Sequence, residues 1–291
     1  SDDGWQLGTG GGNGPKKVFT GHDPKGPYPG GRKATADAIK ASGLTPGIWF
    51  MPFAGTHNDP FFRDHQDWFV KKADGKPYDT AWGGTCMDMT HPGAREYLRD
   101  VVKRIAHDWG YTYFKTDGMW TGSATKQIYV NSGYQDEGMG DAVFANPEKT
   151  NIEAYRDGIK LVREAAGDGV FHLGCCAPQN MRSFGGAFGL VDAMRVGPDN
   201  GPDWGGLQVG PLFATRNYHL HGRIWYNDPD PVYVRTAAKL DHARLICSWV
   251  TISGCLNLSS EDMPALPPDR LDILRRTMPG HGLLPRPVDL F

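Results

Sequence analysis

A regular alternation of short apolar runs with longer helical stretches most constrains how this 291-residue chain can fold. Apolar runs that predict buried strands occupy residues 47–53, 111–117, 170–175, 191–196, 223–227 and 250–254. Helices are predicted over residues 34–42, from Pro92 to Trp109, from a capping box at Thr150 to Ala166, and over residues 231–249 and 268–277. Strands and helices that alternate in this way build a parallel sheet covered by helices.

Each predicted strand ends in polar or small residues, and an irregular loop follows. In an eight-stranded parallel (β/α)8 TIM barrel, the carboxyl ends of the strands meet on one face, and that face carries the active site. The chain supplies six predicted strands, and residues 1–5 begin where a further strand should be ending. We therefore expect an α/β barrel that has been cut out of a longer protein.

The composition is that of a packed globular protein, with 39% hydrophobic and 22% charged residues. The 31 Lys and Arg residues nearly balance the 33 Asp and Glu residues, which argues against nucleic acid or an anionic membrane as a partner. No apolar run approaches the roughly 20 residues of a membrane span, and the first residues are polar, so no signal peptide is predicted. The five cysteines lack metal-finger spacing, and no disulfide framework is expected. These features assign no compartment.

Two carboxylates stand at the ends of predicted strands. Asp117 ends the run Tyr113-Phe-Lys-Thr-Asp, and Lys115 lies two residues earlier on the same face of the strand. A lysine beside an aspartate favours the charged carboxylate that a nucleophile requires, although a single Lys-x-Asp is more often a buried ion pair. Asp199 follows the strand that ends at Arg195, in a stiff Gly-Pro turn, where an ordinary Asx turn is the alternative.

Glycoside hydrolysis needs a pair of carboxylates of this kind. One carboxylate attacks the sugar while the other acts as acid and base, and the two are about 5 Å apart in retaining enzymes. Because Asp117 and Asp199 both follow predicted strands, the sequence predicts that they face the same end of the sheet.

Further residues are predicted on the same rim. Asp2 and Asp3 precede Trp5, an arrangement suited to gripping neighbouring hydroxyls while a sugar face rests on the indole; the alternative is a helix cap beside a core tryptophan. Small residues from Cys175 to Pro178 leave room beside a sugar substituent, or form a plain loop.

Other candidate groups are interpreted as structural. Asp228 and Asp230 flank a proline, which is a common signal for the start of a helix. His219 and His221 alternate as metal ligands can, but no third ligand is nearby, so hydrogen-bonded structure is the favoured interpretation. No Walker loop, dinucleotide fingerprint or Gly-x-Ser-x-Gly elbow occurs in the sequence.

Five motifs occur in a characteristic order: Asp2-Asp3-Gly-Trp5, Gly47-Ile-Trp-Phe50, Tyr113-Phe-Lys-Thr-Asp117, Arg195-x-x-x-Asp199 and Asn227-Asp-Pro-Asp230. Together they resemble the clan D glycoside hydrolases, the α-galactosidases and α-N-acetylgalactosaminidases of families 27 and 36. Residues 68–92 resemble family 36 more closely. The resemblance implies a (β/α)8 barrel over residues 1–280 that lacks its first strand, with residues 281–291 as the start of a carboxy-terminal β domain or a tail.

The resemblance also implies roles for individual residues. Asp117 would be the nucleophile and Asp199 the acid/base of a reaction that proceeds through a covalent glycosyl intermediate. The expected substrate-binding residues are Asp2, Asp3, Trp5, Trp49, Lys115, Cys175 and Arg195. Within this set, the two aspartates would hold the O4 and O6 hydroxyls, the lysine would bind a ring hydroxyl, and the arginine would brace the acid/base.

The chain departs from the family at two places that bear on sugar identity. The loop after Cys175 lacks the Cys-x-Gly-Gly-Gly run common in family 36, and the nucleophile motif reads Lys-Thr-Asp where Lys-Trp-Asp is frequent.

The sequence therefore predicts a retaining exo-α-glycosidase that removes terminal α-galactosyl residues from oligosaccharides or glycoconjugates and needs no metal or other cofactor. Three alternatives remain: an α-N-acetylgalactosaminidase, a transglycosylase like raffinose synthase, and a galactoside-binding barrel without catalysis. Flanking β domains are expected outside this chain, and a homo-oligomer is compatible with the sequence.

Overall fold

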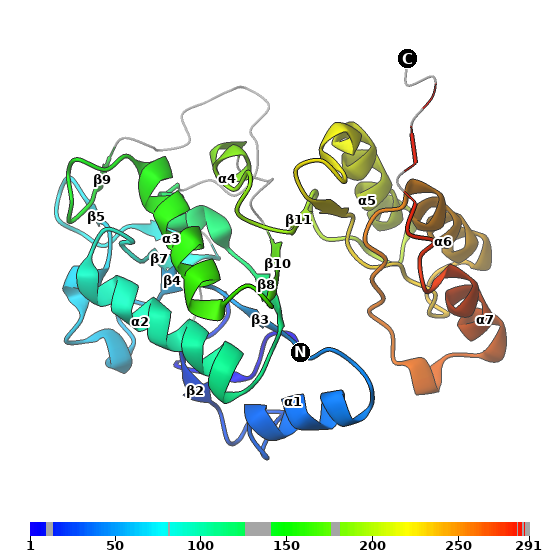
Figure 1. Cartoon of the computed structure of the whole chain (residues 1–291), viewed down its shortest axis with the longest axis horizontal. Helices are drawn as coiled ribbons and strands as arrows, with labels where there is room; N and C mark the ends of the chain where they lie inside the picture. Colours follow the sequence, from blue (N-terminus) through cyan, green and yellow to red (C-terminus); the bar gives the residue numbers. More distant parts are fainter. Residues whose placement is uncertain are drawn as a thin grey trace. The chain divides into compact units, whose positions relative to one another are not determined.

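A computed structural model of the chain describes residues 1–9, 14–80, 82–125, 141–175, 181–283, 285, 286 and 288. The chain divides into two compact units, Ser1–Val191 and Asp192–Phe291 (Figure 1). Each unit holds parallel strands that are followed by helices, so the prediction of an α/β chain is confirmed for the described residues.

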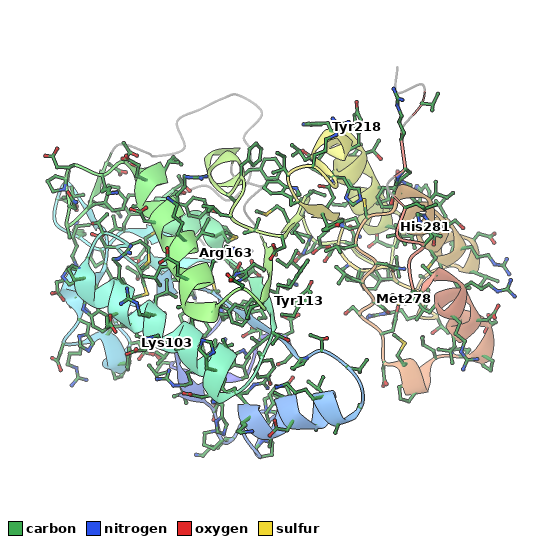
Figure 2. All side chains as sticks on the ribbon, in the orientation of Figure 1. Lys103, Tyr113, Arg163, Tyr218, Met278 and His281 are labelled. Atoms are coloured by element: carbon green, nitrogen blue, oxygen red, sulfur yellow. The ribbon has the colours of Figure 1, made fainter. Side chains whose placement is uncertain are left out.

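The first unit is built around three parallel strands, β3 (Gly47–Phe50), β8 (Tyr113–Thr116) and β10 (Phe171–Gly174). Strand β8 lies in the middle, since the first residues of β3 and β10 are both in register with Tyr113. The ring of Tyr113, which is labelled in Figure 2, stacks on that of Phe171 with the centroids 5.1 Å apart. The strands predicted at these three places are confirmed.

The helices of the first unit are α1 (Arg32–Ala41), α2 (Pro92–Lys103), α3 (Asn151–Ala166) and α4 (Met181–Gly186). Helix α2 continues into a π-helical turn, Arg104–Asp108, and packs against α3 (Figure 1).

The start of α3 is the capping box that the sequence predicts. The hydroxyl of Thr150 accepts the backbone N–H of Glu153 at 3.2 Å, and the carboxylate of Glu153 accepts the backbone N–H of Thr150 at 2.8 Å. Both bonds satisfy N–H groups that a helix start leaves without an intrahelical partner.

Short strands add three antiparallel sheets to the first unit. They pair β1 (Gln6–Leu7) with β2 (Val18–His22), β7 (Gly84–Cys86) with both β4 (Ala54–Gly55) and β6 (Asp79–Thr80), and β5 (Lys71–Lys72) with β9 (Ala142–Val143). Short 3₁₀ turns occur at Pro60–Phe62, Gln66–Trp68 and Met119–Ser123. The sequence analysis missed these strands, since most contain only two or three residues and show no periodicity.

Aromatic side chains fill the core beneath β3 and β8. Trp5 packs on Phe19, Phe19 on Phe50, and Phe50 on Phe114, with ring centroids 5.7, 6.3 and 5.4 Å apart. All four rings are buried. This chain of contacts holds β3 and β8 in place from below.

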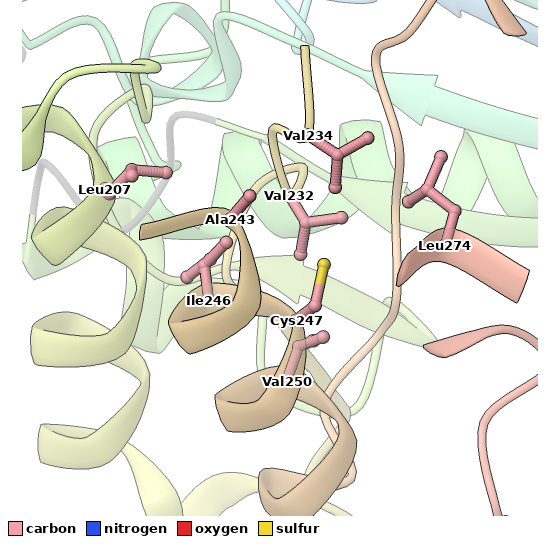
Figure 3. Packing of buried hydrophobic residues seen from close by; sticks show 8 residues of the cluster. All are labelled: Leu207, Val232, Val234, Ala243, Ile246, Cys247, Val250 and Leu274. Atoms are coloured by element: carbon pink, nitrogen blue, oxygen red, sulfur yellow. The ribbon is translucent and has the colours of Figure 1, made fainter. Parts of the chain in front are cut away.

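The second unit pairs β11 (Ala193–Arg195) in parallel with β12 (Tyr226–Asp228). Its helices are α5 (Trp204–Arg216), α6 (Leu240–Ser253) and α7 (Pro268–Thr277), with 3₁₀ turns at Tyr218–Leu220 and Met263–Ala265. Their core is the cluster in Figure 3: Leu207, Val232, Val234, Ala243, Ile246, Cys247, Val250 and Leu274.

The structure corrects the sequence analysis in the second unit. The strand predicted over residues 250–254 is wrong, because α6 continues to Ser253 and buries Val250 beside Cys247 on one helical face. The helix predicted over residues 231–249 starts only at Leu240; before it, the N–H of Val232 donates to the carbonyl of Leu258 at 2.8 Å, in an extended segment. Helix α5 was missed because it contains Pro211 and three glycines. None of the helices in the described part of the chain has the length and apolarity needed to cross a bilayer.

Candidate active site

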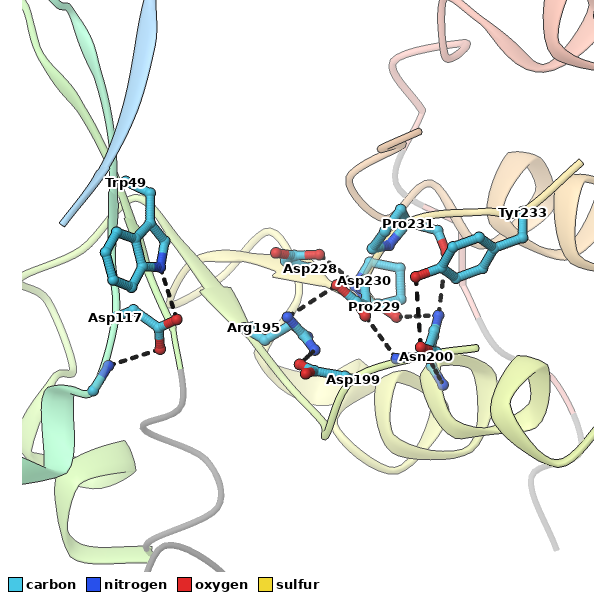
Figure 4. Close-up of polar contacts among 12 residues, drawn as sticks. Trp49, Asp117, Arg195, Asp199, Asn200, Asp228, Pro229, Asp230, Pro231 and Tyr233 are labelled. Atoms are coloured by element: carbon cyan, nitrogen blue, oxygen red, sulfur yellow. Dashed lines mark hydrogen bonds and ion pairs between the residues drawn. The ribbon is translucent and has the colours of Figure 1, made fainter. Parts of the chain in front are cut away.

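Asp117 occupies the carboxyl end of β8. Its backbone N–H donates to the carbonyl of Phe50 at 2.9 Å, so the residue continues the pairing of β8 with β3. Its Oδ2 accepts the indole N–H of Trp49 at 2.9 Å, and its Oδ1 accepts the N–H of Gly118 at 2.7 Å (Figure 4). Only 8% of Asp117 is exposed. Both carboxylate oxygens are therefore held in place while the group still reaches the surface.

Gly118 turns the chain away directly after Asp117. Its φ of +61° lies in the left-handed region, which residues with a side chain rarely adopt. The turn leads into the 3₁₀ helix Met119–Ser123, whose residues are all buried. The carboxylate thus stands at a sharp corner that packing holds rigid.

Lys115 and Cys175 lie on the same face of this sheet. Lys115 is half-buried and in register with Trp49 of β3 and Leu173 of β10, so these three side chains leave the sheet on one side. Cys175 is a buried free thiol two residues after Leu173, and its N–H donates to the carbonyl of Thr116 at 2.7 Å. The structure therefore brings Trp49, Lys115, Asp117 and Cys175 to one end of three strands. Residues 176–180, the rest of the predicted loop, lie outside the described residues.

The segment with the paired aspartates runs beside β3. The N–H of Trp49 donates to the carbonyl of Ser1 at 2.9 Å, which places the following Asp2 and Asp3 near that strand. Both aspartates are exposed, and Oδ1 of Asp3 accepts the side-chain amide of Gln6 at 2.6 Å. Exposed carboxylates at this point are able to accept hydrogen bonds from hydroxyl groups of a ligand.

The prediction that Trp5 carries a sugar is wrong. Its exposure is 0%, because the indole packs edge-on against Trp109 at 5.5 Å and against Phe19 in the core. Its N–H donates to the carbonyl of Trp49 at 2.8 Å. The side chain supports the strand below the site and presents no face to a ligand, as the alternative of a core tryptophan stated.

A buried lysine beside this segment was missed by the sequence analysis. Lys17 is 2% exposed, and its ammonium group donates to the carbonyl of Pro15 at 2.7 Å. Burial lowers the pKa of Lys17 to about 8, although the negative charge of Asp3 acts in the opposite direction. The sequence shows only a Lys-Lys pair at this position, which usually indicates an exposed turn.

In the second unit, Arg195 ends β11 and holds two carboxylates. Its guanidinium contacts Oδ1 of Asp199 at 2.6 Å and Oδ1 of Asp230 at 2.9 Å (Figure 4). The side chain of Arg195 is buried, whereas 86% of the Asp199 side chain is exposed. Asp199 thus presents a carboxylate to solvent from a fixed cationic anchor.

Hydrogen bonds join Asp230 to Asn200, and Asn200 to the backbone beside Asp230. Oδ2 of Asp230 accepts the N–H of Asn200 at 2.6 Å, and the Asn200 amide donates to the carbonyl of Pro229 at 2.9 Å. Asp230 is thus held by an ion pair and a hydrogen bond, but the helix start that the sequence predicts at this segment is wrong, since α6 begins only at Leu240. Asn200 was missed, although an asparagine beside Gly-Pro often bonds to nearby backbone.

His221 lies near this arrangement as a hydrogen-bonded side chain. The Nδ1 atom of His221 accepts the N–H of Asn227 at 3.0 Å, which confirms a hydrogen-bonded structural histidine. Within the residues that the structure describes, no group of three or more His, Cys, Asp or Glu side chains is placed to hold a metal.

Comparison with known proteins agrees with the resemblance that the motifs indicate. Residues 19–138 match the family model described as Melibiase. Over this segment the chain is similar to the melibiase glycoside hydrolases. The resemblance to clan D enzymes that the sequence predicts is thereby confirmed.

The chain is also similar to individual glycosidases. Over 93 residues it is 33% identical to the "A type blood alpha-D-galactosamine galactosaminidase" of Flavonifractor plautii. The matched segment covers 29% of this chain and 9% of that protein. The α-galactosidase of Thermus thermophilus, in complex with p-nitrophenyl α-D-galactopyranoside, matches with a TM-score of 0.68 and 26% identity over 95% of this chain. An α-galactosidase from Lactobacillus brevis, 13% identical, shares the fold with a TM-score of 0.64, over 95% of this chain and 34% of its own. The chain spans 53% of the Thermus enzyme.

Proposed function

We propose that this chain carries the catalytic centre of a retaining exo-α-glycosidase that removes terminal α-galactosyl residues from oligosaccharides or glycoconjugates. The observation that carries the proposal is the carboxylate of Asp117, nearly buried at the carboxyl end of a parallel strand and held at both oxygens. Active sites of βα barrels lie at this end of the strands. The proposal includes the closed (β/α)8 barrel of that family.

In the proposed first step, Asp117 attacks C1 of the terminal sugar as the glycosidic oxygen departs. The C1–O bond to the leaving group breaks, and a covalent β-glycosyl ester to Asp117 forms. The hydrogen bonds from Trp49 and Gly118 fix the carboxylate before the substrate arrives, so little reorganisation is needed during the attack.

Asp199 is the proposed acid/base. It gives its proton to the departing glycosidic oxygen, then takes a proton from the water molecule that attacks C1 and releases Asp117. Arg195 holds Oδ1 of Asp199, which leaves Oδ2 directed to a substrate.

The remaining predicted residues are proposed to bind the terminal sugar. Asp2 and Asp3 would accept hydrogen bonds from its O4 and O6 hydroxyls, and Lys115 would donate a hydrogen bond to a ring hydroxyl. Galacto and gluco sugars differ at O4, and a site built to bond that hydroxyl rejects an analogue that leaves its polar groups unpaired. Trp49, Cys175 and Arg195 complete the proposed lining, with Cys175 near the substituent at C2.

A galactosaminide is the second candidate substrate. The Flavonifractor relative is named for action on α-D-galactosamine, and it aligns with this chain at 33% identity. Hydrolysis rates on aryl α-galactoside, α-galactosaminide and α-N-acetylgalactosaminide distinguish these substrates. Products formed in the presence of excess sugar acceptor identify a transglycosylase, and sugar binding without turnover identifies a non-catalytic barrel.

The nucleophile is tested by exchanging Asp117 for Ala in the chain. We expect turnover of p-nitrophenyl α-galactoside to fall by about 10⁴-fold or more, because the covalent step is lost. Added azide should then restore release of nitrophenol and yield β-galactosyl azide, since azide enters from the side that the carboxylate occupied. The equivalent Asp199→Ala variant should yield α-galactosyl azide, because the covalent intermediate still forms. Retained turnover in Asp117→Ala would contradict the assignment.

Asp168 provides a matched control for these exchanges. It is an exposed aspartate of the same unit, in the turn that precedes β10. Asp168→Ala should retain the wild-type rate on the same substrate. Loss of turnover in this variant would indicate that any aspartate exchange damages the unit.

A further inference from the structure

Trp82 is an exposed tryptophan at the tip of the hairpin that joins β6 and β7. It is 37% exposed, and its φ is +59°, in the left-handed region that bulky residues avoid. Such a conformation is strained and persists only where the surrounding structure holds it. The fold therefore keeps a strained residue where a glycine would fit more easily.

The hairpin tip is anchored on the segment that follows Asp117. A methyl group placed on Gly83 would lie 2.6 Å from Cγ2 of Thr121 and 3.2 Å from Cζ2 of Trp120, so the backbone of the tip packs directly on that 3₁₀ helix. The Trp82 and Trp120 rings are 5.7 Å apart, and Trp120 is fully buried. Trp82 thus projects from a rigid base.

Trp82 also lies beside the proposed nucleophile. A methyl group placed on Gly118 would be 3.7 Å from Cζ3 of Trp82, which puts the indole one residue from Asp117. Trp82 is 37% exposed and Asp117 only 8%, so the indole reaches solvent next to a carboxylate that is nearly enclosed. All these contacts belong to the first unit.

We propose that Trp82 is the stacking platform for the ring of the leaving group next to the bond that is cleaved. This inference rests on the proposed function. In an exo-acting site the terminal sugar occupies the enclosed end, so the group on the exposed side of Asp117 is the leaving group. An indole offers a flat apolar face that suits either a sugar ring or an aryl ring.

The experiment compares leaving groups with and without a ring on the same enzyme. We measure kcat/KM for p-nitrophenyl α-galactoside, for an α-galactosyl disaccharide and for α-galactosyl fluoride, whose leaving group has no ring. Trp82→Gly removes the indole and adopts the positive φ without strain. We expect about a tenfold loss on both substrates with a ring and less than about a threefold loss on the fluoride. Trp82→Phe should recover part of the loss.

Phe188→Ala is the matched control. Phe188 belongs to the same unit and has the same exposed fraction as Trp82, 37%, but it lies in the turn before β11 and not in the hairpin beside Asp117. It should leave all three rates unchanged. Equal losses on all three substrates in Trp82→Gly, or no loss on any, would overturn the inference. A wild-type chain that hydrolyses none of them would contradict the proposed function instead.

Discussion

The indole N–H of Trp49 donates to Oδ2 of Asp117 over 2.9 Å, while the carbonyl of Trp49 accepts the indole N–H of the buried Trp5 at 2.8 Å. The carboxylate is therefore connected, through one residue of β3, to the aromatic core of the first unit. If Asp117 is the proposed nucleophile, Trp49 contributes by position, since the carboxylate has its orientation before the substrate binds.

Removing this indole donor should slow the reaction without unfolding the chain. Trp49→Phe keeps an aromatic ring in the core but leaves Oδ2 of Asp117 without that bond. A hydrogen bond to a charged group is worth about 1.5–3 kcal/mol, so we expect kcat/KM on p-nitrophenyl α-galactoside to fall by about tenfold to a hundredfold. Thermal unfolding of the same sample serves as the control. An unchanged kcat/KM would argue against a positioning role for Trp49.

Breaking the lower ion pair of Arg195 should destabilise the second unit. Asp230→Asn removes a charge that faces the buried guanidinium, while asparagine tolerates the φ of +74° at this position. Loss of one partner of a buried pair costs about 3–5 kcal/mol of unfolding free energy. Denaturant unfolding measures the effect.

Asp241→Asn is the control for that measurement, because Asp241 pairs with Arg244 at 3.5 Å on the surface of the same unit. Exposed pairs of this kind contribute about 0–1 kcal/mol. Equal effects of the two substitutions would show that burial of Arg195 does not determine the loss.

Lys17 should make stability depend on pH above neutrality. Its pKa is about 8 in the folded chain against 10.5 for an ordinary lysine, so between these values the unfolded chain binds the additional proton. The contribution of Lys17 to stability therefore increases as the pH rises from about 8 to 10.5. Lys17→Met should be more stable than the wild type below pH 8, by up to about 3 kcal/mol, and this advantage should shrink toward pH 10.5. The difference between the two unfolding free energies, measured across this range, tests the prediction; a constant difference would contradict it.

The capping box of α3 should contribute a small, separable amount of stability. Thr150→Ala loses the hydroxyl that accepts the N–H of Glu153, and such a loss costs about 1 kcal/mol. Thr150→Ser retains the acceptor and should unfold close to the wild type. Chemical denaturation of both variants checks this, and identical losses would mean that the hydroxyl plays no part.

Much of the first unit was predictable from the sequence because its signals are local. The strands β3, β8 and β10 occur where apolar runs predict them, and α3 begins at the predicted capping box. The segment over residues 250–254 failed for the converse reason. Its β-branched residues favour a strand, but Val250 is buried on the same helical face as Cys247, and packing outweighs that weak preference.

The candidate site also contains residues that local sequence predicts and contacts that only the tertiary structure forms. Asp117 could be placed at a strand end because the apolar run stops there, and its relation to Lys115 follows from alternation along the strand. The partners of Arg195 could be only half predicted: Asp199 is four residues away in sequence, whereas Asp230 is brought to the guanidinium by the pairing of β11 with β12.

Amino-acid order alone is enough to identify the alternation of strands and helices, the helix start at Thr150 and the polar strand ends, because each depends on neighbours within a few residues. Only the tertiary structure decided which tryptophans are buried and which are exposed. Trp5 is enclosed between Trp109 and Phe19, while Trp82 is held out beside Gly118. Burial depends on side chains that arrive from distant parts of the chain, and no local pattern contains that information.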